Sequence, residues 1–291
     1  MRLVLGSSPP PGSPSGTLAN SIKPTGGTET ALTTPSGQQS GLKMKVNIAV
    51  APDTLADFAI DFDACKSIVK AGNSGKYLLK PVLSVIPIVS TSIVGYLHTS
   101  LVVAGTTVSA QVAGVPVRAT PPDGNGRFVL SPVVTGTYDL VITASGRVNA
   151  VVTGVPVTAA GVTTLGSTGA RINTPTSVIS YVASGTITPV GNGGSVRALQ
   201  PLTNGPILEV GFANAIADTG AYGMTLPAGA PVKLAYTAGA TTFAFAADPA
   251  DNVVPGKYRL EASATGSDAV VVKPQVAITL SANVTTDFVF P

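Results

Sequence analysis

Residues 136–146 read GTYDLVITASG, and residues 256–266 read GKYRLEASATG. The two stretches have the same length, and the first Gly, the Tyr, the Leu and the closing Gly coincide at a constant offset. Each is a β-branched, apolar-rich segment bounded by glycines, which is typical of a strand that ends in a turn. An internal repeat of this kind predicts duplicated β-sandwich modules, with Tyr138 and Tyr258 at equivalent strand positions.

The repeat extends on both sides of these stretches. Residues 125–132 precede the first copy, and residues 218–227 precede the second in a parallel arrangement. The second copy has a longer insert, which includes residues 243–252, and the chain closes with the apolar residues 288–290. Asp123 starts a D-G-N-G sequence like that of a calcium loop, but the distal acidic ligand is missing. We therefore interpret it as an Asn-Gly hairpin turn.

The turn and the strand after it resemble a known module. Residues 123–128 fit a D-x-x-G-x-F turn, and residues 136–142 follow it in the manner of G-x-Y-x-L-x-V. This series resembles the carboxypeptidase-regulatory-like, or prealbumin-like, β-sandwich module over most of residues 93–172. The resemblance implies an aromatic residue after Gly146, where this chain has Arg147, so the end of that strand is expected to pack differently.

Three motifs near the N-terminus share a second resemblance: residues 35–43 (PSGQQSGLK), 61–69 (DFDACKSIV) and 75–82 (GKYLLKPV). They resemble the C-terminal half of an exported bacterial domain known as domain of unknown function 4382. Residues 2–5 resemble a strand from the middle of that domain. The resemblance implies that Met1 is not the natural beginning, and that further strands and a signal or lipoprotein peptide are encoded upstream.

Apolar and polar residues alternate in this N-terminal part with period two, which predicts strands over residues 42–50, 58–62 and 77–86. Pro81 suggests that one edge of the last strand has no partner. Asp63 can cap a short helix over 64–71 that Gly72 would end. Residues 6–30 are rich in Gly, Ser and Pro and are predicted to form a mobile loop.

These patterns predict a mainly β protein with three units. The first unit, residues 1–89, is expected to be a partial α+β sheet domain with one short helix. The second unit, residues 90–172, and the third unit, residues 173–291, are expected to be prealbumin- or immunoglobulin-like β-sandwiches.

The charge of the chain excludes a nucleic-acid partner. Its formal net charge of +3 comes from 17 basic and 14 acidic residues, so the high pI reflects few acids rather than many bases. No segment carries a dense Lys/Arg stripe, and no base-stacking motif accompanies the charges. No apolar run approaches the roughly 18 residues of a membrane span, and no export signal precedes Gly6.

The residues that could support catalysis are too few and too scattered. Cys65 is the single cysteine, which excludes an intramolecular disulfide, and its apolar surroundings predict a small buried hydrophobe. His98 is the single histidine and lies in a different predicted unit, so a Cys-His dyad or a Ser-His-Asp triad is not expected. Three acids could suggest a cation site, but a strand surface and a helix cap explain them better: Asp57, Asp61 and Asp63. We predict no catalytic residues, no metal and no cofactor.

Four aromatic residues form the only local concentration of rings: Tyr222, Tyr236, Phe243 and Phe245. They could form a ligand-binding face, because rings stack on the apolar face of a sugar. Alternate aromatic positions on a strand usually point inward, so core packing is the preferred interpretation.

The sequence therefore predicts a non-catalytic exported protein of the bacterial cell envelope with a structural or adhesive role. A carbohydrate-binding module is the alternative. The expected partner is a carbohydrate or another cell-surface protein. The protein is expected in the periplasm or at the cell surface, and any membrane contact would come from a lipid anchor on a segment upstream of this chain.

If strands of the first sheet are missing, its apolar surface and backbone groups are less well covered. We expect weaker hydrogen-exchange protection in residues 42–86 than in residues 115–145. Equal protection in both segments would contradict this expectation.

Overall fold

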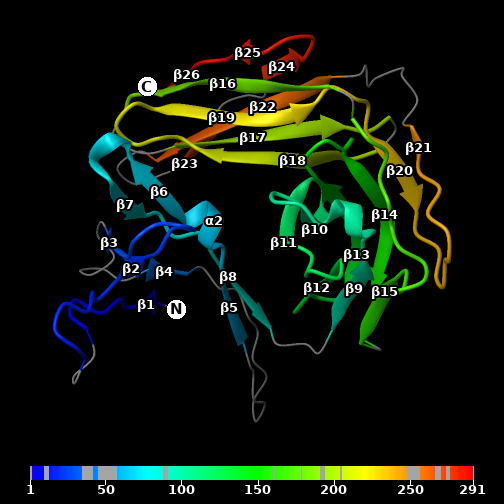
Figure 1. The fold of residues 1–291 in the computed structure, drawn as a ribbon, viewed down its shortest axis with the longest axis horizontal. Coiled ribbons are helices and arrows are strands. Elements are labelled where there is room, and N and C mark those ends of the chain that lie inside the picture. The colour runs from blue at the N-terminus through cyan, green and yellow to red at the C-terminus, as the bar shows by residue number, and fades with distance from the viewer. Residues whose placement is uncertain are drawn as a thin grey trace.

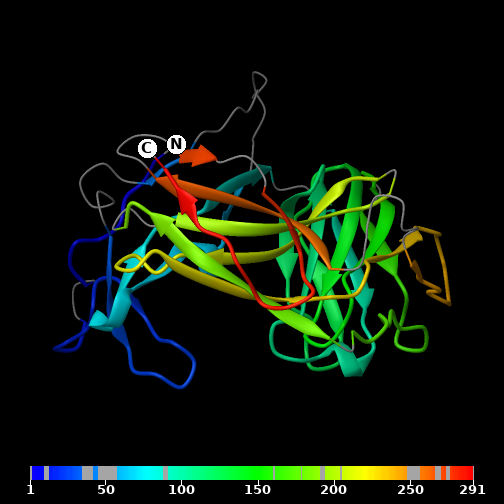
Figure 2. The same ribbon diagram turned by 90° about the horizontal axis from the view of Figure 1, so that it is seen from above.

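The computed structural model describes residues 2–9, 13–34, 42–44, 58–87, 91–159, 161–177, 179–190, 194–203, 205–247, 256–265, 270–272 and 276–290. Strands make up 52% of the structure and helices only 4%, which confirms the predicted mainly β class. The third unit lies across the other two (Figure 1). Seen from above, its strands run from the side of the first unit to the side of the second (Figure 2).

The second unit is a sandwich of two sheets. Its strands are β9 (Ser92–Tyr96), β10 (Thr107–Val112), β11 (Val115–Thr120), β12 (Arg127–Leu130), β13 (Gly136–Thr143), β14 (Ala150–Val157) and β15 (Val162–Leu165). One sheet has the order β12-β9-β15, and the other begins β11-β10-β13-β14. Their inner faces bury a core that includes Phe128, Leu140 and Ile142. A short 3-10 helix, η2 (Thr99–Leu101), follows β9.

The third unit repeats this topology. Its strands are β16 (Ser180–Thr188), β17 (Gly194–Pro201), β18 (Ile207–Asn214), β19 (Ala221–Pro227), β22 (Lys257–Thr265), β23 (Val270–Val272), β24 (Val276–Thr279), β25 (Val284–Thr285) and β26 (Phe288–Val289). One sheet has the order β19-β16-β25, and β26 also pairs with β16. The other has the order β18-β17-β22-β23, and β24 also pairs with β22. Strands β9 to β13 thus correspond to β16 to β19 and β22.

The strand registers confirm the duplication. Leu140 lies opposite Ala110, and Leu260 lies opposite Ala198 in the equivalent strand pair. The register of the neighbouring pair shifts directly after Ala110 in one copy and directly after Ala198 in the other. Tyr138 and Tyr258, two residues before these leucines, therefore occupy equivalent positions, as the repeat predicted. Gly146 closes the first stretch in a turn, whereas residue 266 lies outside the described residues.

A glycine in the same turn of both copies has a clear physical role. Gly126 and Gly220 have φ angles of 80° and 67°, which side-chain-bearing residues rarely adopt. A Cβ at either position would overlap the carbonyl oxygen of Leu97 or Ile187 respectively. Those residues in turn donate their N–H groups to the glycine carbonyls at 2.7 and 2.8 Å. The turns can therefore close onto β9 and β16 only because the side chain is absent.

The insert of the third unit joins the sheet of the second unit. Strand β20 (Val232–Ala235) pairs in parallel with β14, and β21 (Ala246–Ala247) pairs with β20. Val141 and Val151 lie on the face of this sheet that points away from the second unit's own core, and they are buried in the core of the third unit. The two sandwiches are therefore joined by strand pairing and by shared apolar packing.

The described residues of the first unit form three small sheets. Strand β1 (Arg2–Leu3) pairs with β4 (Leu42–Lys43), and β5 (Phe58–Phe62) pairs with β8 (Leu83–Pro87). The third sheet has the order β2-β3-β7-β6, with the bounds Ser21–Ile22, Thr30–Thr33, Lys76–Leu79 and Ile68–Ala71. Strand β5 confirms the predicted strand 58–62.

The predicted helix 64–71 is wrong in its second half. Helix α2 spans Ala64–Ser67, with the predicted N-cap bond from Lys66 N–H to Asp63 Oδ1 at 3.0 Å. The β-branched residues after it form β6 instead, because the turn at residues 72–75 brings β7 alongside as an antiparallel partner. The N-cap at Asp63 thus forms as predicted, but strand pairing ends the helix before Gly72.

Three other expectations for the first unit change. The predicted strand 77–86 is divided into β7 and β8, which belong to different sheets on either side of Pro81. The segment 6–30, expected as a mobile loop, contains β2 and the first residue of β3. Of the predicted strand 42–50, residues 45–50 lie outside the described residues.

Substitution of Gly220 should destabilise the protein more than substitution of a glycine with the same backbone geometry in open space. Gly239 has a φ of 70° and no atom within 4 Å of a built Cβ, so it is a matched control. We expect Gly239→Ala to cost about 1–2 kcal/mol from backbone strain alone. Gly220→Ala adds an overlap with the Ile187 carbonyl and should cost clearly more in urea unfolding. Equal losses would show that the turn does not need close contact with β16.

Candidate functional site

A cleft of about 1040 Å³ lies between the three units. Strand β5, helix α2 and the segment around β8 form its wall in the first unit. Strand β11 and the loop after β12 form the facing wall in the second unit, and β18 of the third unit closes one side. Figure 1 shows β5 and β8 facing β11 and β12 beneath β18. Residues from all three units therefore meet here.

Glu209 on β18 forms a junction between the three units. Its backbone is held by Gln111 of the second unit, whose Nε2 donates to the Glu209 carbonyl at 2.7 Å and whose Oε1 accepts the Glu209 N–H at 3.0 Å. Its carboxylate accepts from Lys66 of the first unit at 2.8 Å and lies 3.4 Å from Arg197 of its own unit. Gln111 and Glu209 are both buried. A buried carboxylate is tolerated only when it is paired, so this geometry requires all three units in place.

Besides its ion pair with Glu209, Lys66 contacts two other residues of β18. Its ammonium lies 4.6 Å from the centroid of the Phe212 ring, within the range of a cation–π contact. The Asn214 side chain donates to the backbone carbonyls of Cys65 and Lys66 at 3.3 and 3.2 Å. Helix α2 is only one turn long, and these contacts fix it against the third unit.

Arg197 completes the charged network on the same sheet. Its guanidinium donates to Glu261 at 2.5 Å in addition to its contact with Glu209. Burial opposes the charge on Arg197, but the hydrogen bond and negative charge of Glu261, followed by those of Glu209, outweigh burial and raise the pKa of Arg197. The network thus keeps a permanent positive charge beside two carboxylates.

A second ion pair crosses the cleft. Arg118 on β11 lies 2.6 Å from Asp61 on β5, and its guanidinium also donates to the Pro132 carbonyl at 3.3 and 3.4 Å. The Arg118 side chain is largely buried, whereas that of Asp61 is about one-third exposed. Solvent screening therefore makes this pair weaker than the junction around Glu209. It nevertheless joins the two walls directly.

The residues considered for catalysis do not converge. Cys65 is exposed at the cleft, contrary to the expected buried position, because the single turn of α2 presents it to solvent rather than to a core. His98 instead caps η2, with its Nδ1 accepting from the Ser100 N–H at 3.2 Å and lying 2.8 Å from Ser100 Oγ. Arg147, noted for replacing an aromatic residue, donates to Ser100 Oγ at 2.9 Å and to the Thr174 carbonyl at 2.7 Å.

The acidic residues considered for a cation site have other roles. Asp61 pairs with Arg118, Asp63 caps α2, and Asp57 lies outside the described residues. Asp123 accepts N–H groups from Asn125 and Arg127 at 2.9 Å each and so caps a tight turn. The predicted hairpin is wrong, because this turn links β11 and β12, which belong to different sheets. In the part of the chain that the structure describes, no group of three or more His, Cys, Asp and Glu side chains could hold a metal ion.

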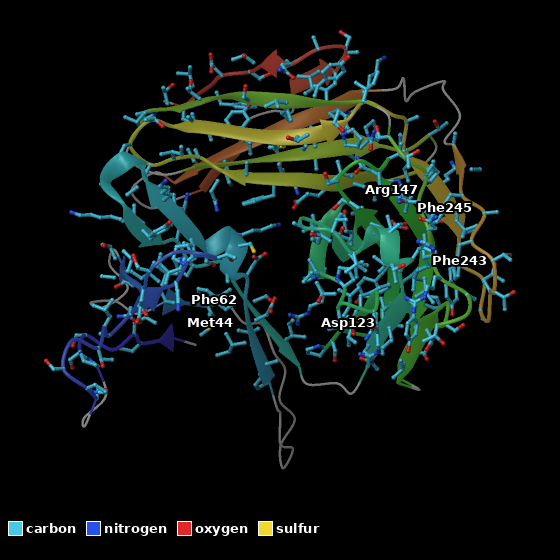
Figure 3. The ribbon with its side chains drawn as sticks, in the orientation of Figure 1. Met44, Phe62, Asp123, Arg147, Phe243 and Phe245 are labelled. Atoms are coloured by element: carbon cyan, nitrogen blue, oxygen red, sulfur yellow. The ribbon has the colours of Figure 1, made fainter. Side chains whose placement is uncertain are left out.

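The four predicted aromatic residues separate into two places. Tyr222 is buried in the core of the third unit, 6.1 Å from the Phe288 ring centroid, with its hydroxyl donating to the Thr286 carbonyl at 2.7 Å. Burial, followed by the charge of Asp287, raises the pKa of Tyr222 to about 12. The other three pack, partly buried, against the core of the second unit: Tyr236, Phe243 and Phe245. Figure 3 shows Phe243 and Phe245 on the side of the second unit away from Phe62 at the cleft.

Sequence reasoning did not identify the residues that join the units. Glu209 and Gln111 each interrupt a run of small and apolar residues, at ILEVGF and VSAQVAG respectively. A polar side chain in such a strand must find a partner when it is buried, which is the one signal that could have found them. Lys66 and Arg197, which pair with Glu209, carry no distinguishing local pattern.

Residues 1–81 match the family model described as Domain of unknown function (DUF4382), which agrees with the resemblance of the first unit. No curated protein matches the chain. Among solved structures, a type II cohesin–X-dockerin complex from Acetivibrio cellulolyticus shares 21% identity over 30% of this chain, with a TM-score of 0.26. The chain spans 58% of that structure, which is less than two thirds of its length.

A candidate adhesin from Bacteroides ovatus shares 12% identity over 66% of this chain and 83% of its own, with a TM-score of 0.21. Neither likeness is close enough to carry an argument about function. Among the described residues, no helix has the length and apolar character needed to cross a membrane.

Removal of the Glu209 charge should weaken the whole assembly. Glu209→Gln keeps the shape but leaves Lys66 and Arg197 with less negative charge, and we expect a loss of about 1–3 kcal/mol in urea unfolding. Glu29→Gln is a suitable control, because Glu29 is exposed and accepts a hydrogen bond from Ser21 of its own unit. If Glu209→Gln lowered the free energy of unfolding no more than Glu29→Gln does, the junction would not be important for stability.

Proposed function

We propose that this chain is a non-catalytic, exported protein of the bacterial cell envelope with a structural or adhesive role. The observation that supports this best is the junction at Glu209, which ties three units together through buried polar contacts. A buried polar pair restricts its partners to one relative orientation, because any other leaves a charge or an amide without a partner. A fixed orientation suits a protein that bears load or presents a surface.

Two further features favour a rigid assembly. Strand β20 of the third unit extends the sheet of the second, so the two sandwiches share backbone hydrogen bonds. The charged side chains at the junction are occupied by one another. They therefore stabilise the assembly rather than offering free groups for acid–base chemistry.

The match of residues 1–81 supports the proposed location, because the sequence resemblance is to an exported bacterial domain. We place the protein in the periplasm or at the cell surface. Membrane contact would come from a lipid anchor upstream of this chain. The proposed partner is a cell-surface protein or carbohydrate, with no role for nucleic acid or a cofactor.

Carbohydrate binding is the second candidate. Tyr236 and Phe243 line a small pocket together with the hydroxyl-bearing residues Thr237 and Thr242, and rings beside hydroxyl groups suit a sugar. The pocket holds only about 30 Å³, roughly the space of one water molecule. A sugar would therefore have to bind across its rim. A glycan array with the wild-type protein and Phe243→Ala tests this candidate directly.

The proposed role is tested in cells that lack the gene. We expect the deletion to weaken surface attachment or envelope integrity, and the wild-type protein to restore it. Glu209→Gln should restore it less well because the units are less firmly joined. His98→Ala should restore it fully and is the matched control for a catalytic role. Protease treatment of intact cells should cleave the protein if it lies at the cell surface.

Two results would contradict the proposed role. A screen of ester, amide and glycoside substrates that finds turnover, with loss of that turnover in His98→Ala, would establish an enzyme. Recovery of the protein in the cytoplasmic fraction alone would exclude an envelope role.

A further inference from the structure

Strand β11 forms one edge of the main sheet of the second unit. In the described structure β10 is its only strand neighbour, whereas the opposite edge at β14 is covered by β20 and β21. The N–H and C=O groups of an edge strand that point away from its partner can pair with another strand, except at Pro116 of β11, which has no N–H to donate. The open edge faces the cleft, because residues 116–121 line it.

The third unit shows what can lie beside the strand that is equivalent to β11. Strand β18 is the counterpart of β11, and it borders the first unit rather than open solvent. The side chain of Asn214 at the end of β18 donates to the carbonyls of Cys65 and Lys66. Helix α2 is thus held against the end of β18 by side-chain contacts, whereas no described strand pairs with the outer edge of β11.

The side chains beside the open edge are apolar and exposed. Val115 and Val117 on β11 are 50% and 40% exposed, and Val134 beside them is 44% exposed. Phe62 and Val82 on the facing wall are 39% and 43% exposed. Apolar surface concentrated on two facing walls is typical of an interaction site, whereas single exposed apolar residues are common on any protein.

We infer that the cleft binds an extended, uncharged apolar segment of another protein, which pairs with β11 as an additional strand. This inference names a partner for the proposed adhesive role and rests on that role. The Asp61–Arg118 pair joins the two walls, and a cleft spanned in this way suits a single extended chain better than a bulky domain. Backbone pairing would give affinity, and alternate side chains would contact the valines of one wall and Phe62 of the other.

The charges of the cleft define the chemistry of this partner. Lys66 pairs with Glu209 and Arg118 pairs with Asp61, so these four charges are balanced within the protein. A charged segment would have to break these pairs or lose its own hydration, whereas an uncharged apolar segment matches the lining. The cleft also continues the contact between the first and third units, because Lys66, Phe212 and Asn214 line its closed side.

The same sheet already binds a short strand, mostly apolar but with one lysine, from elsewhere in the chain. Residues 232–235, with the sequence VKLA, pair with β14 at the opposite edge, and the side chain of Val232 is buried in the core of the second unit. The sheet therefore accepts a short apolar strand contributed by a distant segment of sequence.

The test uses the full chain and a fluorescent peptide of roughly eight alternating Thr and Val residues with a Lys at each end. We expect saturable binding and slower hydrogen exchange in residues 115–120 when the peptide is bound. The same peptide with a central proline should bind about tenfold more weakly, because proline cannot donate to a ladder. Val117→Lys should weaken binding to a similar degree, and Val162→Lys, at an exposed valine on β15, is the matched control.

Several outcomes would overturn the inference. Binding that is unchanged by Val117→Lys, or that leaves exchange at residues 115–120 unaltered, would place the peptide elsewhere. A concentration-dependent dimer that Val117→Lys abolishes would identify a second copy as the occupant. Absence of binding by a wild-type protein with a normal circular dichroism spectrum would remove the docking site. That last result would leave the cell-based test of the envelope role unaffected, so the two proposals can fail separately.

Discussion

The arrangement of this protein depends on one buried carboxylate, that of Glu209. A carboxylate removed from water is stable only beside compensating charge and hydrogen-bond donors. Lys66 and Arg197 supply the charge, and Gln111 holds the backbone of the same residue. Because these partners come from three different units, the pairing requirement of a single side chain specifies how the units sit together. Apolar packing alone would allow more sliding between them, since it has no direction.

Duplication and its departures explain the rest of the architecture. The two sandwiches share strand order, register and the close turns at Gly126 and Gly220. The two sandwiches differ in which segments lie beside the edges of their sheets. The insert of the third unit covers one edge of the second unit, and the first unit borders β18, whereas its counterpart β11 remains open at the cleft. A symmetrical pair of modules has thereby become an asymmetrical body in which the β11 edge faces the cleft.

Local sequence patterns failed where distant segments compete for the same residues. Asp63 caps a helix as expected, yet the helix stops at Ser67 because β7 offers Ile68 and the residues after it a strand partner. Cys65 was expected to be buried because its sequence neighbours are apolar, but burial depends on which units enclose a residue. Tyr222 precedes the other three rings in the same part of the sequence, but it belongs to a different core. In each case the deciding contact comes from a segment remote in the chain.

The sequence by itself determined the mainly β class, the duplicated strand with Tyr138 and Tyr258, and the turn at Asp123. Each of these depends on interactions within a few residues or on a repeat that is visible in one dimension. Only the tertiary structure decided that β20 crosses to the neighbouring sheet, that Glu209 joins three units, and that β11 faces an open cleft. Such features depend on which surfaces meet, and strand edges and polar partners carry no label in the sequence that says with what they will pair.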